Sequence, residues 1–519
     1  MRLGFSYVGL IYLLMLFLPN LVWAKNKPRD YEKYVVRERK AFLVLERVGE
    51  VLVTCILLVF RDFNLRRFTL WSLWLLLSFT LMVFYELYWV RYFRSEKTMK
   101  DQYRSFLCFP VAGASLPVIA IFFLGIYGVN IWLCLAVTIL GIGHIGIHLD
   151  HEREVIGPRE KGPIALRILK KAGAVLLLLL AIALLIPIGV RDLRFIKHWG
   201  NFMEGVEEEA YLPLGGEDQY VLMMGRNASN PVIIYLHGGP GSPDTMVMYT
   251  FAEHLMDDYT VIGWDQRGAG KTYYRNMGKD PENQTVSFSQ ALLDLDELVD
   301  YACERFGQEK VILMGHSYGT ILGSQYVLSH PEKVSQYVGV GQMVSMAEGE
   351  VCSYEDALGK AKAAGEDTSE MERRYETFRA EGSITSMLSL RKEVAKYHPI
   401  PNEKNAIWQG ISSPYFSVDD LRWFMKQMFS MEEFLGLNTQ LLDYATTFDA
   451  CEAGTTYQVP VHFFFGSEDW ICPVPLIREY MDAITAPQKD LTLLEGYGHS
   501  PHTDGPKEFV HAMKEHLLP

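Results

Sequence analysis

The chain has 519 residues, of which 49% are hydrophobic and 21% charged, and its formal net charge is −13 at pH 7. A hydrophobic share this large is high for a soluble enzyme, and the excess lies before Trp199. Residues 1–197 carry 26 Lys and Arg against 14 Asp and Glu, whereas residues 198–519 carry 23 against 48. The acidic second part offers no basic groove, which argues against nucleic acid as a partner.

Apolar segments near the N-terminus are long enough to cross a bilayer, which requires about 20 apolar residues in a helix. The six predicted spans are Leu3–Val22, Ala41–Phe60, Phe68–Val90, Phe106–Gly128, Ile131–His148 and Ala172–Val190. The last span is nearly pure Ala, Leu, Ile and Val and contains no charged residue. The first span could instead be a signal peptide cleaved after Ala24, but cleavage would leave the basic segment Lys25–Lys40 outside.

The charges between these spans predict an orientation, because basic residues near the membrane favour the cytoplasmic side. Lys25–Lys40, Arg91–Arg104 and Asp150–Lys171 carry 18 Lys or Arg together, whereas the alternate connections carry three. We therefore expect a multi-pass protein of the cell membrane whose acidic second part is extracellular. The 7 cysteines form no disulfide pattern, which favours a bacterial surface over an animal secretory route.

Ionisable side chains at membrane depth suggest a second, separate hypothesis. Glu46 and Glu50 lie four residues apart in the second span, and His144, His148 and His151 share one face near the end of the fifth. Imidazoles at this spacing are suited to zinc or another transition metal. The alternative is that the histidines are interfacial and the glutamates are paired within a packed bundle.

The second part of the chain alternates apolar strands with helical segments, which predicts a mostly parallel sheet with helices on both faces. This rhythm stops between about residues 343 and 457, where a helical cap over a pocket is expected. The expected organisation is a five-span all-α transmembrane bundle over residues 1–155 and a linker, sixth span and connector over 156–208. The sheet domain with its cap then occupies 209–519.

A nucleophile motif lies at the end of one predicted strand. The apolar run 311–314 leads into Gly315–Gly319 (Gly-His-Ser-Tyr-Gly) and then into a predicted helix. This is the Gly-x-Ser-x-Gly elbow, in which a strained strand-to-helix turn exposes a serine hydroxyl beside a helix N-terminus. Ser317 is therefore the candidate nucleophile.

An acid and a histidine should follow the serine in that order. Asp469 comes just after the predicted strand 459–466, and Glu468 beside it is the close alternative. His499 follows the last predicted strand in a glycine-containing loop, and His502 is the fallback. Ser317, Asp469 and His499 are therefore expected to form a catalytic triad.

The oxyanion of the reaction requires two backbone N–H donors. Tyr318, directly after the nucleophile, is expected to supply one. The other is expected from His237–Gly241 (His-Gly-Gly-Pro-Gly), which follows the predicted strand 232–236, with Gly239 preferred over Gly238. No cofactor or metal is required for acyl transfer by such a site.

Four short motifs, taken together, resemble those of a known enzyme family. The segments His237–Pro243, Asp265–Gly270 and Gly315–Gly319, with Gly498–Ser500, resemble the prolyl aminopeptidase (proline iminopeptidase) group of α/β-hydrolases. The resemblance covers about residues 209–519. It implies an α/β-hydrolase fold that removes an N-terminal residue, often proline, from a short peptide through an acyl-enzyme. It also implies a helical cap whose acidic side chains hold the substrate's free ammonium group.

The resemblance is incomplete at the amine clamp. Some relatives carry a glutamate directly after the triad aspartate, whereas this chain has Trp470 there. Glu432 and Glu433 in the cap are candidate substitutes, and with Trp470 they are the predicted substrate-binding residues. Two rival functions stay open: an esterase, amidase or lactonase using the same triad on another small acyl substrate, and a membrane sensory or metal-handling module with an attached hydrolase.

Overall fold

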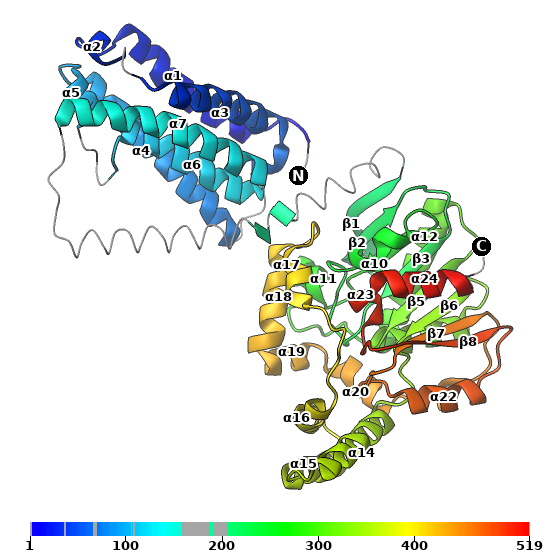
Figure 1. Cartoon of the computed structure of the whole chain (residues 1–519). Coiled ribbons are helices and arrows are strands. Elements are labelled where there is room, and N and C mark those ends of the chain that lie inside the picture. Colours follow the sequence, from blue (N-terminus) through cyan, green and yellow to red (C-terminus); the bar gives the residue numbers. More distant parts are fainter. Residues whose placement is uncertain are drawn as a thin grey trace. The chain divides into compact units, whose positions relative to one another are not determined.

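The computed structural model describes residues 3–35, 38–65, 70–104, 106, 109–157, 186–187, 189–190 and 205–517. The chain forms two compact units, Met1–Lys197 and His198–Pro519. We call them the helical unit and the sheet unit and describe each by itself (Figure 1).

The helical unit is built from long apolar helices. They are α1 (Tyr7–Lys25), α3 (Lys40–Val59), α4 (Leu73–Phe93), α6 (Ala112–Gly128) and α7 (Ile131–Ile156). Short helices α2 (Glu32–Val35), η1 (Arg61–Phe63), η2 (Leu70–Ser72) and α5 (Met99–Tyr103) lie in the connections. Glycines bring α3 and α7 close together: a Cβ on Gly143 would lie 2.4 Å from the backbone nitrogen of Glu46. Such small-residue contacts are typical of helices that pack within membranes.

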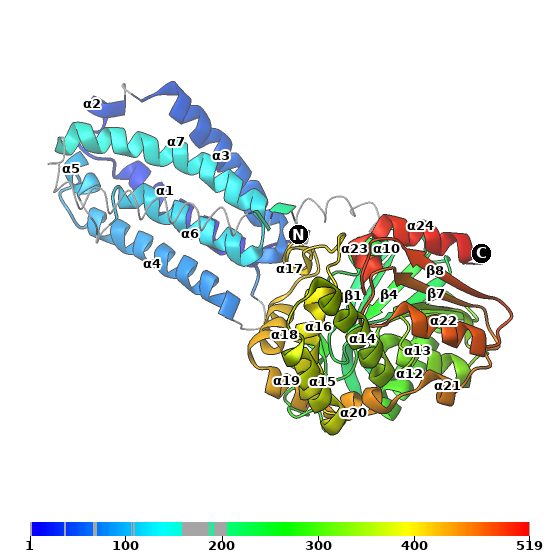
Figure 2. The same cartoon turned by 60° about the horizontal axis from the view of Figure 1, so that its bottom comes forward.

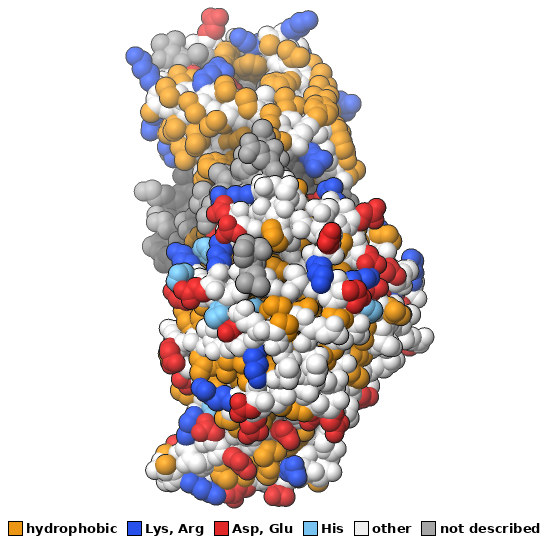
Figure 3. Space-filling view, turned by 90° about the vertical axis from the view of Figure 1, so that its right-hand side faces the viewer, with side chains coloured by type: hydrophobic (Ala, Val, Ile, Leu, Met, Phe, Trp, Pro, Cys, Tyr) orange, Lys and Arg blue, Asp and Glu red, His pale blue; other side chains and the backbone are white. Residues whose placement is uncertain are grey.

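Three of the described helices, α1, α4 and α7, are long and apolar enough to cross a membrane, and α6 is a shorter apolar helix. α3 has 20 residues but includes Glu46, Arg47 and Glu50. It nevertheless presents an apolar face, because Val44, Val48 and Val51 are all exposed. Figure 3 shows hydrophobic side chains gathered over the surface of the helical unit. These features associate the protein with a membrane.

The helix boundaries differ most from the predicted spans at three ends. α6 begins at Ala112 rather than Phe106, because Phe106 and Phe109 form an isolated β-bridge before the helix. α4 begins at Leu73 rather than Phe68, and α7 continues past His148 to Ile156. Hydropathy marks the apolar part of a helix, whereas backbone hydrogen bonding carries α7 on through a charged turn. The predicted sixth span, Ala172–Val190, lies almost entirely outside the described residues.

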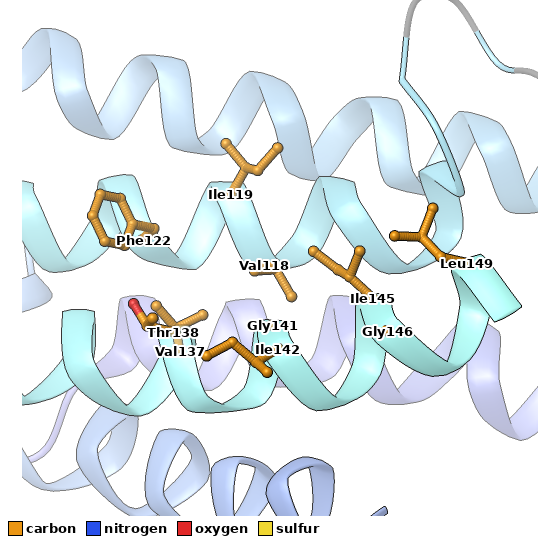
Figure 4. Close-up of a pocket in the computed structure, with 10 residues that line it drawn as sticks. All are labelled: Val118, Ile119, Phe122, Val137, Thr138, Gly141, Ile142, Ile145, Gly146 and Leu149. Carbon is orange, nitrogen blue, oxygen red and sulfur yellow. The ribbon is translucent and has the colours of Figure 1, made fainter. Parts of the chain in front are cut away.

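An apolar groove of about 450 Å³ lies on the helical unit between α6 and α7 (Figure 4). Its lining comes from both helices: Val118, Ile119, Phe122, Val137, Thr138, Gly141, Ile142, Ile145, Gly146 and Leu149. The only hydroxyl in the lining, that of Thr138, donates to the carbonyl of Cys134 in its own helix. The groove therefore offers hydrocarbon contact and no polar recognition.

The sheet unit contains an eight-stranded sheet in the order β1-β2-β4-β3-β5-β6-β7-β8. The strands are β1 (Val206–Leu214), β2 (Glu217–Gly225), β3 (Val232–Leu236), β4 (Thr260–Trp264), β5 (Val311–His316), β6 (Val334–Val340), β7 (Val461–Gly466) and β8 (Lys489–Leu494). β1 and β2 pair antiparallel, as do β2 and β4, and the remaining pairs are parallel. The predicted mostly parallel sheet is confirmed.

Helices cover both faces of this sheet. β3 is buried throughout and alternates: Val232, Ile234 and Leu236 join one core cluster, and Ile233 and Tyr235 join the other. The first cluster includes residues of α12 (Phe288–Phe306), α13 (Tyr318–Ser329) and α22 (Val474–Ala483); the second includes residues of α10 (Tyr249–Leu255) and α24 (Pro506–His516). Two further helices, α11 (Gly270–Asn276) and α23 (Pro501–Asp504), follow strands β4 and β8. This is the two-faced arrangement expected from near-continuous apolar strands.

The segment between β6 and β7 contains helices and no described strand. Its helices are α14 (Met346–Ala364), α15 (Ser369–Glu381), α16 (Ile384–Val394), η3 (Ala395–Tyr397), α17 (Ala406–Ile411), α18 (Val418–Phe429), α19 (Met431–Leu437), α20 (Thr439–Thr447) and α21 (Ala450–Ala453). In Figure 1 the labelled helices of this segment, olive to orange, lie to the left of the strands and below them, and Figure 2 shows the same helices from another direction. We call this segment the cap.

Candidate active site

The strand-to-helix turn after β5 holds Ser317 in a strained conformation. Ser317 has φ 53° and ψ −123°, a region that L-residues rarely adopt and that is characteristic of functional turns. The flanking glycines make the turn possible: a Cβ on Gly315 would lie 2.5 Å from the carbonyl oxygen of Gly319, and one on Gly319 would lie 2.2 Å from that of Leu236. The sequence motif therefore folds as the elbow that it predicts.

Asp469 and His499 are joined by hydrogen bonds. His499 Nδ1 lies 2.9 Å from Asp469 Oδ2 and 3.1 Å from Oδ1. The carboxylate is fully buried and also accepts the backbone N–H groups of Ile471 and Cys472, at 3.0 and 2.9 Å. These two bonds fix the carboxylate at the end of β7, so it can orient the imidazole. Glu468, the alternative acid, instead accepts a hydrogen bond from the Ser467 hydroxyl.

The turn Val340–Gly341 contacts the backbone of the serine and lies against the ring of the histidine. The backbone N–H of Ser317 donates to the carbonyl of Val340 at 3.0 Å. A Cβ on Gly341 would lie 3.0 Å from Cε1 of His499 and 3.3 Å from Oδ2 of Asp469. The other ring nitrogen of His499, Nε2, is buried and makes no hydrogen bond to any residue that the structure describes. That nitrogen is the one a general base would direct toward a serine hydroxyl.

The loop after β3 lies against the serine. A Cβ on Gly238 would lie 3.0 Å from Ser317 Cβ, so a side chain at this position would force the loop or the nucleophile turn to shift by a few tenths of an ångström. Gly239 has φ 118° and precedes a cis peptide bond to Pro240. His237 braces the loop, because its Nε2 accepts the backbone N–H of Gln266 at 3.2 Å. The structure therefore places Gly238, the second choice for the oxyanion donor, against the nucleophile, and Tyr318 begins α13 directly after Ser317.

His502, the fallback base, lies in a different hydrogen-bond network. Its Nε2 lies 3.0 Å from the hydroxyl of Tyr235, which donates to Asp244 at 2.6 Å. The His502 ring also packs on that of His316, at 4.4 Å between centroids. His316 in turn donates from Nε2 to the carbonyl of His499 at 3.0 Å. His502 and His316 therefore support the loop that carries His499.

Burial favours the neutral forms of His316 and His237. Burial, and then the neighbouring imidazoles of His502 and His499, hold the pKa of His316 well below its usual range. Burial also lowers the pKa of His237. A neutral imidazole can donate from one nitrogen and accept at the other. The hydrogen bonds of His237 require this form, because its Nδ1 donates to the carbonyl of Gly238 at 2.8 Å and its Nε2 accepts the Gln266 N–H. The His237–Gln266 contact joins two of the sequence motifs, whereas no motif marks the contact between Tyr235 and His502.

Of the predicted substrate-binding residues, Glu432 and Glu433 lie at the surface, whereas Trp470 directly follows Asp469. Glu432 and Glu433 are exposed on α19, and Glu433 pairs with Lys426 of α18. Trp470 stacks on His398 with 5.7 Å between ring centroids, and its carbonyl accepts the hydroxyl of Ser353.

Sequence reasoning missed a buried acid in the cap. Glu350, on α14, is 4% exposed and accepts a hydrogen bond from Arg391 Nε at 2.7 Å. Its helix lies against the segment that follows Asp469, because a Cβ on Gly349 would lie 3.5 Å from the carbonyl of Ile471. Glu350 and Arg391 are 41 residues apart in the sequence. No local sequence pattern could therefore have predicted that they pair.

The histidine row of the helical unit is engaged by side chains. His144 Nδ1 lies 2.5 Å from a Glu46 carboxylate oxygen, and the Tyr103 hydroxyl lies 2.9 Å from His148 Nδ1 and 3.1 Å from His151 Nδ1. Among the described residues, groups with ligand atoms within 4.8 Å of one another occur in the sheet unit: Asp244, His316 and His502; His462, Asp490 and His516; Asp469, Cys472 and His499. The speculative metal site at His144, His148 and His151 therefore gains no support from the structure.

Comparison with known proteins agrees with this architecture. A family model described as the alpha/beta hydrolase fold matches residues 231–506, more than half of the chain. The chain belongs to the α/β-hydrolase family, as its sheet order and elbow indicate, and it is a hydrolase.

Within that family the similarity extends to peptidases. The chain is 23% identical over 323 residues to a probable aminopeptidase, YbaC, of Bacillus subtilis, which covers 59% of this chain and 94% of that protein. It is 25% identical over 298 residues to the proline iminopeptidase PfmaB of Pestalotiopsis fici, covering 55% of this chain and 92% of that protein. Among solved structures, a proline iminopeptidase-related protein of Thermus thermophilus matches with a TM-score of 0.41 and 19% identity, covering 60% of this chain and 97% of the other. The resemblance predicted from the sequence motifs is confirmed.

Proposed function

We propose that the protein is a membrane-anchored serine hydrolase that releases N-terminal residues, of the proline type, from short peptides. The observation that carries the proposal is the Asp469–His499 hydrogen bond beside the strained Ser317. The similarity to aminopeptidases and proline iminopeptidases supports the substrate class.

The proposed chemistry is acyl transfer to water. Asp469 holds His499 so that Nε2 accepts the Ser317 proton while the serine oxygen attacks the scissile carbonyl carbon. The backbone N–H groups of Tyr318 and Gly239 stabilise the oxyanion that forms. As the tetrahedral intermediate collapses, the C–N bond breaks and the imidazolium gives its proton to the leaving amine. Water then attacks the acyl-enzyme with the same base, which releases the acid and restores the Ser317 hydroxyl.

The conformation of the elbow supports this assignment energetically. A non-glycine residue at φ 53° costs on the order of 1–3 kcal/mol and persists only where the surrounding structure enforces it. The enforcing contacts at this turn are the close approach of Gly238 and the hydrogen bond from the Ser317 N–H to Val340. The position thus places the hydroxyl at the N-terminus of α13, where the helix dipole favours negative charge.

An esterase or amidase is the second candidate, and one observation favours it. An aminopeptidase needs an unpaired acid to hold the substrate's ammonium group, but Glu350 of the cap is neutralised by Arg391. Glu433 is likewise paired with Lys426 at the surface. A substrate without a free amine would need neither carboxylate.

A substrate panel separates the two candidates. The purified full chain should hydrolyse aminoacyl-naphthylamides, prolyl first, and should lose at least tenfold in kcat/KM when the amine is acetylated. Hydrolysis of p-nitrophenyl esters alone, without a free-amine requirement, would replace the peptidase assignment by the esterase one and leave the triad intact.

We further propose that the sheet unit lies outside the cell, from the asymmetry of basic charge between the predicted spans. Cys451, on the exposed surface of α21, permits a direct test. A membrane-impermeant maleimide should label it in intact cells, and a Cys451→Ser variant should lose that label. Labelling of Cys451 only after permeabilisation would show that the sheet unit lies inside the cell.

A further inference from the structure

One face of α18 in the cap presents large apolar side chains to solvent. Leu421, Met425 and Met428 recur at helical spacing and are 44%, 46% and 59% exposed, and Phe429 is 75% exposed. Met431, which begins α19, continues the face at 44% exposure. We call these five residues the cap face. Single exposed apolar residues are ordinary on soluble surfaces, whereas a contiguous set marks an interaction surface.

The helix cannot turn to bury these residues, because its opposite face is fixed. Trp423 is 2% exposed and donates from Nε1 to the carbonyl of Gly241 at 2.8 Å. Gln427 donates to the hydroxyl of Ser242 at 2.9 Å. The cap face is therefore held outward by the same contacts that attach α18 to the loop beside Ser317.

Two of the cations that border the cap face are already paired. Arg422 forms an ion pair with Asp419 at 2.9 Å and stacks on the ring of Tyr274 at 3.8 Å. Lys426, one turn on, pairs with Glu433. Paired charges lower the cost of approaching a medium of low polarity, since an unpaired charge would have to be desolvated alone.

The chain itself indicates what covers the face, because it carries helices suited to a bilayer. If Ala172–Val190 spans the membrane, 14 residues separate it from Gly205, where the description of the sheet unit begins. A fully extended chain covers about 3.5 Å per residue, so the unit stays within roughly 50 Å of the lipid surface. That reach is about the diameter of a globular unit of this size.

We propose that the cap face is a bilayer-contacting surface, which seats α18 and α19 among the lipid headgroups and upper acyl chains. Leu, Met and Phe side chains are suited to that layer, as in interfacial helices that lie in the membrane plane. The contact brings the segment Gly238–Ser242, and with it the mouth of the candidate site, to the membrane interface. This inference rests on the proposed membrane anchor and is independent of the substrate.

Photo-crosslinking of the full chain in proteoliposomes tests the contact. Vesicles of equal parts phosphatidylcholine and phosphatidylglycerol would contain protein with p-benzoylphenylalanine in place of Phe429 or, in a second preparation, Met425. The matched control places the same residue at Leu293, which is 60% exposed on α12 of the same unit. Flotation of the vesicles, measured in parallel, reports the anchor separately.

We expect phospholipid adducts, seen as a mass shift of the cross-linked peptide, at Phe429 and Met425 at least fivefold above Leu293. Equal yields at all three positions in chains that float would overturn the inference and leave the anchor standing. A crosslinked dimer at Phe429 would overturn it in favour of a second copy of the chain. Failure of the chain to float with the vesicles would contradict both the proposed membrane anchor and the proposed bilayer contact of the cap face.

Discussion

Lys271 and Asp420 form a buried ion pair that joins the sheet to the cap. The Nζ and Oδ2 atoms lie 3.3 Å apart, and the two side chains are 4% and 7% exposed. Lys271 follows β4 and Asp420 caps the N-terminus of α18, where it accepts the backbone N–H of Ser417 at 2.6 Å. The ammonium also donates to the carbonyl of Tyr415 at 3.1 Å and lies 4.1 Å from the ring centroid of Tyr220.

Replacement of this lysine should therefore loosen the cap. We expect Lys271→Met to destabilise the sheet unit by about 3–5 kcal/mol, because it leaves the Asp420 carboxylate buried without its partner. The melting temperature of the full chain in detergent should fall by about 5–15 °C. Lys514→Met is the matched control, since Lys514 pairs with Asp258 at the exposed surface and should change the melting temperature by less than about 2 °C. Equal shifts in the two variants would show that the buried pair contributes no special stability.

The nucleophile gives the most direct prediction about activity. Ser317→Ala should lower kcat by at least about 1000-fold on any substrate that the enzyme turns over, because no acyl-enzyme can form. A fluorophosphonate probe should modify the wild-type chain at Ser317 and fail to modify the variant. Ser324→Ala is a suitable control, since that buried serine lies two turns further along α13 and donates to its own helix. Full turnover by the Ser317→Ala chain would end the serine hydrolase proposal.

Asp469 should contribute to catalysis by orienting His499 and fixing its tautomer. Asp469→Asn keeps the size of the side chain but favours the wrong tautomer of His499, so kcat should fall by about 10⁴-fold with little change in KM. Glu468→Gln, at the neighbouring position, is the control and should retain most of the activity. A larger loss from Glu468→Gln than from Asp469→Asn would assign the triad acid to Glu468.

The approach of the loop to the nucleophile predicts that Gly238 cannot be enlarged. A Cβ at this position would lie 3.0 Å from Ser317 Cβ and 3.3 Å from His316 Nδ1. Gly238→Ala should therefore shift the loop and lower kcat/KM by about 10²-fold, the cost of losing one oxyanion donor. Gly278→Ala, where a Cβ meets nothing within 4 Å, should leave kcat/KM within about twofold. Comparable activity of the two variants would show that this loop does not supply an oxyanion donor.

The elbow and the Asp469–His499 pair could be predicted because the fold fixes where their side chains lie. Loops after the carboxyl ends of parallel strands meet at one edge of the sheet, so the positions after β5, β7 and β8 converge whatever lies between them. The cap interrupts the sequence between β6 and β7, yet it does not alter the register Phe464↔Val340. The distance of 30 residues between Asp469 and His499 is therefore no obstacle to prediction.

The sequence could not predict in the same way which side of each cap helix is buried. α18 has apolar residues on both sides, with Trp423 inward and Phe429 outward, so its periodicity does not reveal which side is buried. The acids of α19 share this ambiguity, and Glu432 and Glu433 lie at the surface rather than beside Asp469. The Glu350–Arg391 and Lys271–Asp420 pairs depend on how helices dock, which no local motif encodes.

The predicted spans illustrate a related difference between hydropathy and structure. Apolar composition ends near His148, but α7 continues to Ile156 and ends at Gly157, whose φ is 83°. Charged residues such as Arg153 and Glu154 are good helix formers and continue the backbone hydrogen bonds beyond the apolar stretch. A span boundary read from hydropathy therefore marks the end of the apolar stretch and not the end of the helix.

A buried carboxyl beside the cap makes a prediction about pH. Burial raises the pKa of Asp265 to about 6, although the nearby Lys271 ammonium acts in the opposite direction. In the unfolded chain the group titrates near about 3.9, so the folded state retains a proton that the unfolded state releases. Its contribution to stability is therefore fully present below pH about 4 and is lost as pH rises through about 6.

Asp265→Asn should remove this dependence. The melting temperature of the variant relative to wild type should rise between pH 4 and 6 and become constant above about 7, a change on the order of 1–3 kcal/mol in the free energy of unfolding. Only this pH-dependent part is diagnostic, because the substitution also alters the hydrogen bonds from Thr245 and the Lys271 N–H. Asp258→Asn, at the exposed surface, should give no comparable change over that interval. A difference that is flat from pH 4 to 7 would mean that Asp265 is ionised throughout, held charged by Lys271.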